Sequence, residues 1–247
     1  MKPKVIVLKT DGSNCEEEMN FAFNLAGAES EIIHINELFA GDKKLKGYQI
    51  LALPGGFTYG DDVMAGKLLA NQLLYKLGKE IKQFTQADKL VLGVCNGFQV
   101  LVRTGLLPFG GKPAEDASLI INDNAKFMSQ WEGLVIQDSK CVFTVNLAGR
   151  QIEYPIAHGE GKFIIKDNDV LERLKENNQI VFKYTGNPNG SVEDIAGVCD
   201  QSGKILGLMP HPERFVQKTQ HYNWRGQEIE TPHGLPIFQN AVNYFKS

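Results

Sequence analysis

Short apolar runs alternate with longer amphipathic stretches through the first part of the chain. The strands expected from these runs are Val5–Leu8, Glu31–Ile35, Tyr48–Leu53 and Leu90–Val94. Each is bounded by charged or turn-forming residues, a pattern typical of strands buried in a parallel sheet. The stretches with apolar residues at helical spacing are Cys15–Ala26, Asp61–Gln86 and Asn96–Thr104. The second of these contains two glycines, Gly66 and Gly78, at either of which the helix can break. This alternation predicts a mostly parallel, doubly wound α/β sheet with helices on both faces.

The pattern changes after Gly105. Alternating apolar and polar residues predict an added antiparallel sheet, with strands at Leu119–Asn122, Gly133–Gln137, Cys141–Asn146 and Gln151–Ala157. The elements expected after these are a helix at Val170–Asn178, a strand at Ile180–Tyr184, a hairpin of Ile195–Cys199 with Lys204–Leu208 and a helix at Leu235–Phe245. We find no internal repeat and no low-complexity linker, so we expect a single domain over residues 1–247. The polar, aromatic stretch at 216–232 shows no periodicity.

The composition excludes two kinds of partner. The 247 residues carry a formal net charge of −3, with 43% hydrophobic and 22% charged residues. This balance lacks the basic field of nucleic-acid binders, so we expect no nucleic-acid partner. No apolar run approaches the roughly 18 residues of a membrane span, and Met1-Lys-Pro-Lys4 leads directly into a strand rather than a signal peptide. We therefore expect a cytoplasmic protein with no membrane partner.

The four cysteines are widely scattered. Cys15, Cys95, Cys141 and Cys199 form no CxxC pair, which argues against a disulfide framework and against a zinc knuckle. We therefore predict no metal site. Cys141 and Cys199 lie in strand-like apolar runs and are expected to be small buried hydrophobic residues.

Cys95 differs from Cys141 and Cys199 because it lies on a predicted bend between a strand and a helix. An apolar run stops at Gly93-Val-Cys-Asn-Gly97 and continues with helical spacing, the pattern of a nucleophile elbow. Glycines on both sides keep neighbouring side chains clear of the crowded bend. A thiol at the start of a helix meets unpaired N–H groups and the positive end of the helix dipole, which favour the thiolate.

Two further segments complete the chemistry that a cysteine nucleophile requires. Paired glycines follow a predicted buried strand in Leu53-Pro-Gly-Gly-Phe-Thr-Tyr-Gly60, where backbone N–H groups can approach an oxyanion or form a plain tight turn. Among the five histidines, His211 lies just past a predicted strand, with Glu213 two residues later in an extended segment. Pro210 and Pro212 stiffen this segment. His211 is therefore the candidate base, and Glu213 is the group that orients it.

These segments together resemble a known family. Gly93-Val-Cys-Asn-Gly-Phe-Gln99, Pro54-Gly-Gly56 and Pro210-His-Pro-Glu213 resemble the class I (triad) glutamine amidotransferases. The closer resemblance, to the glutaminase subunits of phosphoribosylformylglycinamidine synthase in purine biosynthesis, rests on Gly12-Ser-Asn-Cys-Glu16, Leu53-Pro-Gly-Gly-Phe-Thr-Tyr-Gly-Asp61 and Pro155-Ile-Ala-His-Gly-Glu-Gly161. It spans most of the chain and implies a flavodoxin-like core.

The resemblance also implies a reaction. Cys95 attacks the side-chain amide of glutamine, His211 transfers the proton to the leaving ammonia, Glu213 orients His211, and water hydrolyses the thioester. Backbone N–H groups of Gly56 and Asn96 hold the oxyanion. Gln99 and His158 line the glutamine pocket, although the loop of His158 also fits a plain glycine turn.

The family's partners follow from the same resemblance. Ammonia passes to a synthetase subunit that uses ATP and Mg to amidate formylglycinamide ribonucleotide, often with a small bridging subunit. No cofactor is expected on this chain, which carries no P-loop pattern. Asn14 either approaches the synthetase or caps a helix.

Two other functions fit parts of the sequence. A different cysteine hydrolase on a similar sheet, such as the stress-related peptidases and deglycases, places a cysteine on a comparable elbow. The sequence pattern of that family is a poor match for His211-Pro-Glu213 near the end of this chain. A non-catalytic binding module with the same fold is the other alternative, and its sign is a missing triad member. The sequence contains all three candidate members, Cys95, His211 and Glu213.

Overall fold

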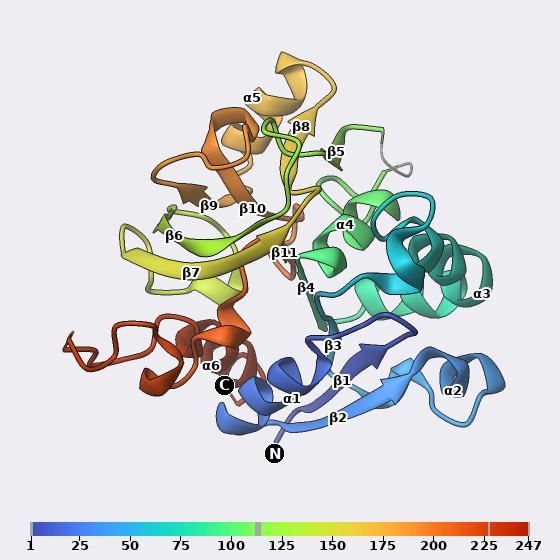
Figure 1. Ribbon diagram of the computed structural model, residues 1–247. Coiled ribbons are helices and arrows are strands. Elements are labelled where there is room, and N and C mark those ends of the chain that lie inside the picture. The colour runs from blue at the N-terminus through green and yellow to red at the C-terminus, as the bar shows by residue number, and fades with distance from the viewer. Residues whose placement is uncertain (1, 112–114, 227, 247) are drawn as a thin grey trace.

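A computed structural model describes residues 2–111, 115–226 and 228–246. Within these residues, nine strands form one continuous sheet (Figure 1). In spatial order the strands are β2 (Glu29–His34), β1 (Lys4–Lys9), β3 (Ile50–Leu53), β4 (Leu90–Val94), β11 (Ile205–Leu208), β10 (Ile195–Cys199), β9 (Ile180–Tyr184), β6 (Met128–Ile136) and β7 (Gln151–His158).

The sheet has a parallel part and an antiparallel part. β2, β1, β3, β4 and β11 pair in parallel, whereas β10, β9, β6 and β7 continue the sheet through antiparallel pairs. A small separate antiparallel sheet joins β5 (Ala117–Ile120) to β8 (Lys162–Ile165). The doubly wound α/β prediction is therefore confirmed, with most of the added antiparallel strands extending the main sheet.

Helices cover both faces of the parallel strands. The α-helices are α1 (Glu16–Leu25), α2 (Ile35–Ala40), α3 (Lys67–Gln86), α4 (Asn96–Arg103), α5 (Asn168–Glu176) and α6 (Leu235–Asn243). Figure 1 shows α1 and α6 grouped on one side and α3 and α4 on the other. Phe23 of α1 meets Phe238 of α6 edge to face, with ring centroids 5.0 Å apart.

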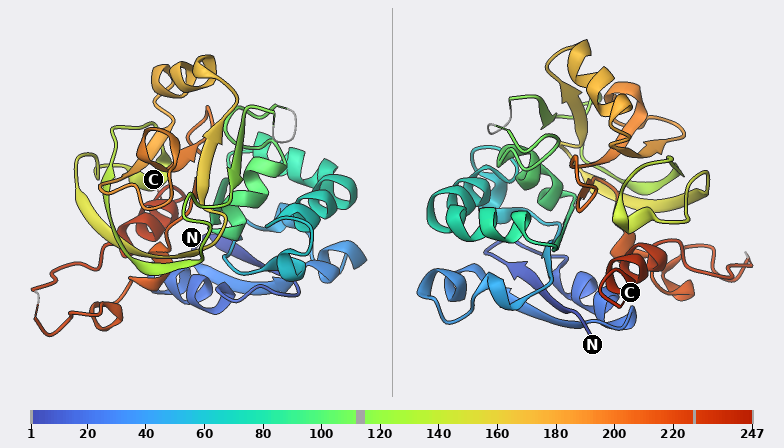
Figure 2. Two further views of the ribbon diagram at one scale, coloured as in Figure 1. Left: turned by 45° about the horizontal axis from the view of Figure 1, so that its top comes forward. Right: turned by 180° about the vertical axis from the view of Figure 1, so that it is seen from behind.

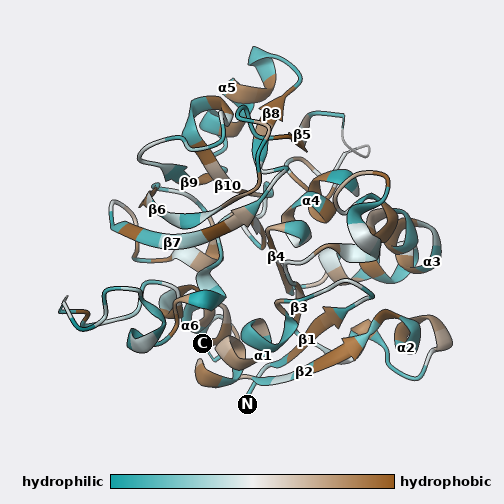
Figure 3. Ribbon diagram, in the orientation of Figure 1, coloured by the Kyte–Doolittle hydropathy of each residue, from teal (hydrophilic) through white to brown (hydrophobic). Residues whose placement is uncertain are grey.

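The core follows the apolar runs of the sequence. Every residue of β3, β4, β10 and β11 is buried, and Figure 3 shows hydrophobic colour along β1 and β4. Cys141 and Cys199 are buried, as expected. In the described part of the chain, no helix combines the length and apolar character that crossing a membrane requires.

Several predicted boundaries are wrong. The helix α2 was not predicted, because its few residues show little periodicity; His34 and Glu37 form a capping box that begins it. The predicted strand at 141–146 is a 3-10 turn at Val142–Thr144. The helix expected from Asp61 begins only at Lys67. β8 was also missed, because its four residues are too few to show a pattern.

The stretch at 216–232 extends from the body of the molecule (Figure 2), and its Gln227 lies outside the described residues. Its base packs on β6 and β7. The buried His221 lies 2.9 Å from Glu153 through Nε2 and Oε1, and its ring centroid is 4.8 Å from that of Trp131. The stretch therefore supports the antiparallel edge of the sheet.

Candidate active site

Cys95 lies on a strained bend between β4 and α4. Its φ of 52° and ψ of −107° are rare for a residue other than glycine, and such conformations cluster at functional sites. A Cβ on Gly97 would lie 2.0 Å from the Leu53 carbonyl oxygen, and a Cβ on Gly93 would lie 2.6 Å from the Gly97 oxygen. Only glycine therefore lets β3, β4 and α4 approach this closely, and the predicted elbow is present.

The elbow opens into a small cavity of about 130 Å³. Its walls come from the loop after β3, the start of α4 and the loops next to β6 and β7. The lining residues are Gly56, Phe57, Asp61, Ala65, Cys95, Gln99, Phe127, Ala157, His158, Gly159 and Glu160. This is the carboxyl edge of the parallel strands, where open α/β sheets bind their ligands.

His211 and Glu213 form a buried pair just after β11. His211 Nδ1 lies 2.6 Å from Glu213 Oε1, and the two residues are 1% and 0% exposed. The backbone N–H of His211 donates to the Pro155 carbonyl of β7 at 2.9 Å. The predicted extended geometry is wrong, because Pro212 begins a 3-10 turn over Pro212–Arg214. The turn nevertheless brings the carboxylate to Nδ1.

The charge of Glu213 controls the proton on His211. Burial lowers the pKa of His211, but the negative charges of Glu213 and Cys95 outweigh it and hold this pKa well above its ordinary value. With Nδ1 bonded to Glu213, Nε2 is buried and has no hydrogen-bond partner among the described residues. Nε2 is therefore the ring nitrogen of His211 that Glu213 leaves unoccupied.

Gly55 brings Cys95 and His211 together. A Cβ built on Gly55 would lie 2.7 Å from His211 Cε1 and 3.4 Å from Cys95 Cβ. The two side chains are thus neighbours across this glycine. The thiol of Cys95 donates to the Ala157 carbonyl at 3.6 Å.

The two residues predicted to donate to the oxyanion, Gly56 and Asn96, each have a backbone N–H outside the pairing of their own segment. Gly56 faces Ser13 in an isolated antiparallel bridge whose hydrogen bonds are made by the residues on either side, which leaves the Gly56 N–H outside that pairing. Asn96 is the first residue of α4, and the first N–H groups of a helix have no partner within it. Gly56 lines the cavity with Cys95.

Gln99 and His158, the two residues predicted to bind substrate, both line this cavity. The side-chain amide of Gln99 already has hydrogen-bond partners. Gln99 Nε2 donates to the Glu160 carbonyl at 2.6 Å, and its Oε1 accepts from Asn96 Nδ2 at 3.0 Å. The Gln99 side chain therefore holds the pocket wall in place. His158 Nδ1 lies 3.1 Å from Asn122 Oδ1.

Cys15 belongs to this site, a contact that the sequence alone did not predict. Its sulfur lies 4.0 Å from His211 Nδ1 and accepts from Arg214 Nη2 at 3.0 Å. Asn14 Oδ1 accepts from the Cys15 thiol at 3.0 Å, so Asn14 does not cap α1 through its side chain. The available signal was the position of Cys15 just after the first strand, which ends at the same sheet edge as the elbow.

Cys15, His211 and Glu213 also have the donor types of a metal site, with these atoms within 4.8 Å of one another. The guanidinium of Arg214 lies against the same sulfur and places a positive charge where a cation would bind. We therefore regard these residues as a hydrogen-bonded cluster around His211.

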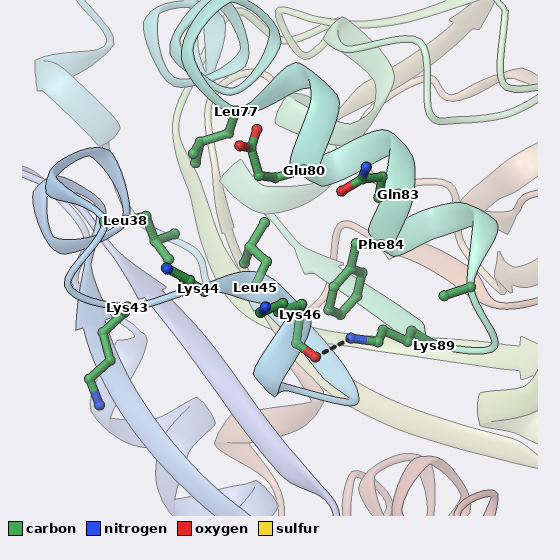
Figure 4. A pocket seen from close by; sticks show the side chains of 12 residues that line it. Leu38, Lys43, Lys44, Leu45, Lys46, Leu77, Glu80, Gln83, Phe84 and Lys89 are labelled. Carbon is green, nitrogen blue, oxygen red and sulfur yellow. Dashed lines mark hydrogen bonds between the residues drawn. The ribbon is translucent and has the colours of Figure 1, made fainter.

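A larger cavity of about 530 Å³ lies at the opposite edge of the sheet, between α2 and α3 (Figure 4). Lys43, Lys44 and Lys46 surround an apolar floor that includes Phe84. Its Lys89 donates to the Lys46 carbonyl at 2.9 Å. No cysteine or histidine lines this cavity, so it lacks the groups that the cavity at Cys95 brings together.

Over residues 2–245 the sequence matches the CobB/CobQ-like glutamine amidotransferase domain. The chain belongs to this family of glutamine amidotransferases. The fold and the cysteine elbow agree with that assignment.

Curated relatives specify the branch of the family. The phosphoribosylformylglycinamidine synthase subunit PurQ of Dehalococcoides mccartyi is 44% identical over 251 residues, which cover 98% of each chain. The subunit of the same name from Methanococcus maripaludis is 42% identical over an alignment of 270 positions, gaps included, which covers 99% of each chain. The chain is thus a glutamine amidotransferase subunit of the PurQ type.

Solved structures agree. A chain of the PurLQS structure from Thermotoga maritima superposes with a TM-score of 0.80 at 33% identity, over 99% of this chain and 100% of that one. A glutamine amidotransferase from Thermotoga maritima has a TM-score of 0.54 at 17% identity, over 92% of this chain and 82% of that one. That second likeness shows the fold alone.

Proposed function

We propose that this chain, as one amidotransferase domain over residues 1–247, hydrolyses glutamine to glutamate and ammonia for a phosphoribosylformylglycinamidine synthase. Cys95 is the nucleophile, His211 the acid and base, and Glu213 the group that orients His211. The observation that carries the proposal is the buried His211–Glu213 pair beside a cysteine on a strained elbow that opens into a cavity.

The first step forms a thioester. With the proton of Cys95 on His211 Nε2, the thiolate attacks the amide carbon of glutamine and the carbonyl oxygen becomes an oxyanion. His211 then gives this proton to the amide nitrogen, the C–N bond breaks, and ammonia leaves. Glu213 stabilises the protonated His211 throughout this transfer, consistent with the raised pKa of His211.

The second step releases glutamate. Water gives a proton to His211 and attacks the thioester carbon, and the C–S bond breaks to restore the sulfur of Cys95. One glutamine and one water become one glutamate and one ammonia. In both steps the N–H groups of Gly56 and Asn96 donate to the oxyanion, and one such donor typically contributes about 100- to 1,000-fold in rate.

The ammonia serves a partner. The curated relatives are named as subunits of phosphoribosylformylglycinamidine synthase, and one matched structure is of PurLQS. These names support a complex with a synthetase subunit. In that complex we expect the synthetase to use ATP and Mg to convert formylglycinamide ribonucleotide to formylglycinamidine ribonucleotide. The PurLQS name also supports a third subunit. We expect that subunit to be small and to bridge the other two, and we expect no cofactor on this chain.

The alternatives predicted from the sequence receive less support. The two curated relatives are PurQ subunits and not peptidases or deglycases. The buried hydrogen bond between His211 and Glu213 is the arrangement that turnover requires, and a non-catalytic module has no need for it.

The proposal is tested by glutamate release from glutamine, with wild type and Cys95→Ala compared alone and with the synthetase and its nucleotide substrate. We expect release that depends on Cys95 and rises sharply with the synthetase. If folded wild-type protein leaves glutamine untouched in every mixture, the amidotransferase function is wrong.

A further inference from the structure

Two free thiols lie beside His211, and a glycine separates them. Cys15 and Cys95 are 1% and 5% exposed. A Cβ built on Gly55 would lie 3.1 Å from Cys15 Sγ and 3.4 Å from Cys95 Cβ. Both cysteines therefore border the same point, and only a residue without a side chain at position 55 lets them come this close.

Backbone contacts hold both cysteines in place. The N–H groups of Asn14 and Cys15 each donate to the Gly55 carbonyl at 3.3 Å, which fixes the start of α1 against the loop after β3. β3 pairs in parallel with β4, and Cys95 follows β4 directly. Since a disulfide brings its two Cβ atoms to about 3.5–4.5 Å, we expect the two side chains to rotate toward each other when such a bond closes.

Cys95 is the sulfur that an oxidant meets first. Peroxides oxidise thiolates far faster than thiols. Cys95 lies at the N-terminus of α4 beside His211, whose raised pKa keeps it protonated, and both features favour the thiolate. Cys95 also lines the cavity of about 130 Å³, which is large enough to hold a molecule as small as hydrogen peroxide.

Cys15 has the properties of a second, resolving thiol. Burial raises the pKa of Cys15, so the group stays protonated and reacts slowly with an oxidant itself. Cys15 is also not among the described residues that line the cavity. Arg214 Nη2 lies 3.0 Å from Cys15 Sγ, and this positive charge stabilises the sulfur when it loses its proton. Cys15 is therefore placed to react with Cys95 after Cys95 has been oxidised.

We propose that Cys15 and Cys95 form a reversible disulfide when the protein meets a hydroperoxide. The bond stops the glutaminase reaction, because it occupies the nucleophile, and it keeps Cys95 from becoming an irreversible sulfinic acid. This inference goes beyond the proposed function, since the bond forms without glutamine.

The bond forms in two steps. The Cys95 thiolate attacks one oxygen of hydrogen peroxide, the O–O bond breaks, and Cys95 becomes a sulfenic acid. The hydroxide that leaves takes the proton of His211 and becomes water. Cys15 Sγ then attacks the Cys95 sulfur, the S–O bond breaks, and the hydroxyl group leaves as water with the Cys15 proton. Each sulfur gives up one electron, and the peroxide accepts both.

Peptide mapping tests the proposal. The reduced wild-type chain is treated with hydrogen peroxide, digested without a reductant and analysed by mass spectrometry. We expect a pair of peptides joined through Cys15 and Cys95, which dithiothreitol separates. Glutamate release with the synthetase should fall as this pair appears and return with dithiothreitol.

Cys15→Ser measures the protection of Cys95. Without the resolving thiol, sulfinic acid on Cys95 should accumulate about tenfold faster than in wild type, and dithiothreitol should not remove it. Cys141→Ser is the matched control, because Cys141 is a free buried cysteine that is not among the described residues lining the cavity. It should form the disulfide as wild type does. Thermal unfolding checks that both variants fold.

The proposal is overturned if peroxide produces no disulfide between Cys15 and Cys95 in folded wild type. Equal rates of sulfinic acid formation in wild type and Cys15→Ser would overturn it as well. The mass spectra need no turnover, so the two proposals fail separately. A chain that forms the disulfide but releases no glutamate in any mixture keeps this inference and loses the glutaminase function.

Discussion

Two cysteines lie beside the same histidine, and their surroundings differ. Both precede a helix, Cys15 at the start of α1 and Cys95 at the start of α4. Cys95 has a φ of 52° and lines the cavity. Cys15 has an ordinary φ of −111° and lies 4.0 Å from His211 Nδ1, the nitrogen that Glu213 already occupies.

The comparison shows that a position at the N-terminus of a helix does not by itself make a cysteine nucleophilic. Burial raises the pKa of the Cys15 thiol more than His211 lowers it, and the protonated thiol donates to Asn14 Oδ1. A nucleophilic cysteine in this fold needs three further features: a bend that lifts the sulfur, a cavity for the substrate, and a base nitrogen without another partner. Only Cys95 has all three.

The largest expected effect on activity comes from removing the negative charge of Glu213, the partner of His211. Glu213→Gln should lower kcat/KM for glutamine about 100- to 10,000-fold, because the carboxylate no longer orients or stabilises the imidazolium. The raised pKa means that wild-type His211 keeps its proton well above pH 6.5, so loss of this proton sets the alkaline limb of the pH–rate profile. In Glu213→Gln that alkaline limb should move to lower pH.

A pH–rate profile of wild type, Glu213→Gln and the exposed control Glu80→Gln checks this expectation. Glu80 lies at the opposite edge of the sheet, lining the cavity of Figure 4, so its change should leave the profile alone. An alkaline limb at the same pH in Glu213→Gln would contradict the assigned role.

A smaller effect should follow from filling the elbow. Gly97→Ala puts a Cβ 2.0 Å from the Leu53 carbonyl oxygen, so β3 and α4 must separate. We expect the free energy of unfolding to fall by about 3 kcal/mol. Gly78→Ala is the matched control, because a Cβ there meets nothing within 4 Å, and it should raise stability by about 0.5–1 kcal/mol. Chemical denaturation measures both, and equal effects would mean that the elbow tolerates a side chain.

The smallest effect should come from Cys15. Cys15→Ala removes the acceptor for Arg214 Nη2 and should lower kcat/KM by about tenfold or less, through looser positioning of His211. Cys15→Ser keeps a small acceptor and should recover most of the loss. A loss as large as that of Cys95→Ala, in a folded protein, would make Cys15 part of the chemistry.

Much of the fold was predictable because β3, β4 and β11 are buried on both faces and therefore read as apolar runs. The failures lie where short segments carry little pattern. The helix α2 depends on a capping box at His34, and the apolar run at 141–146 fits a turn as well as a strand. Neither outcome could be chosen from periodicity alone.

The triad candidates were predictable because the elbow and the Pro-His-Pro-Glu segment each follow a strand. The contacts between site residues that are far apart in the sequence were not predictable. Cys15 and His211 are separated by 196 positions, and no local pattern reports their contact. The engaged amide of Gln99 also depends on Glu160, from another part of the chain. Such pairings exist only in the folded structure.

The most direct test of the central claim is to label the nucleophile. Wild-type protein is treated with an electrophilic glutamine analogue, such as a diazoketone, and the modified peptide is identified by mass spectrometry, with excess glutamine as a competitor. We predict one adduct per chain, on Cys95 alone, that glutamine suppresses. An adduct on Cys15, or labelling of Cys95 that glutamine does not suppress, would contradict the account.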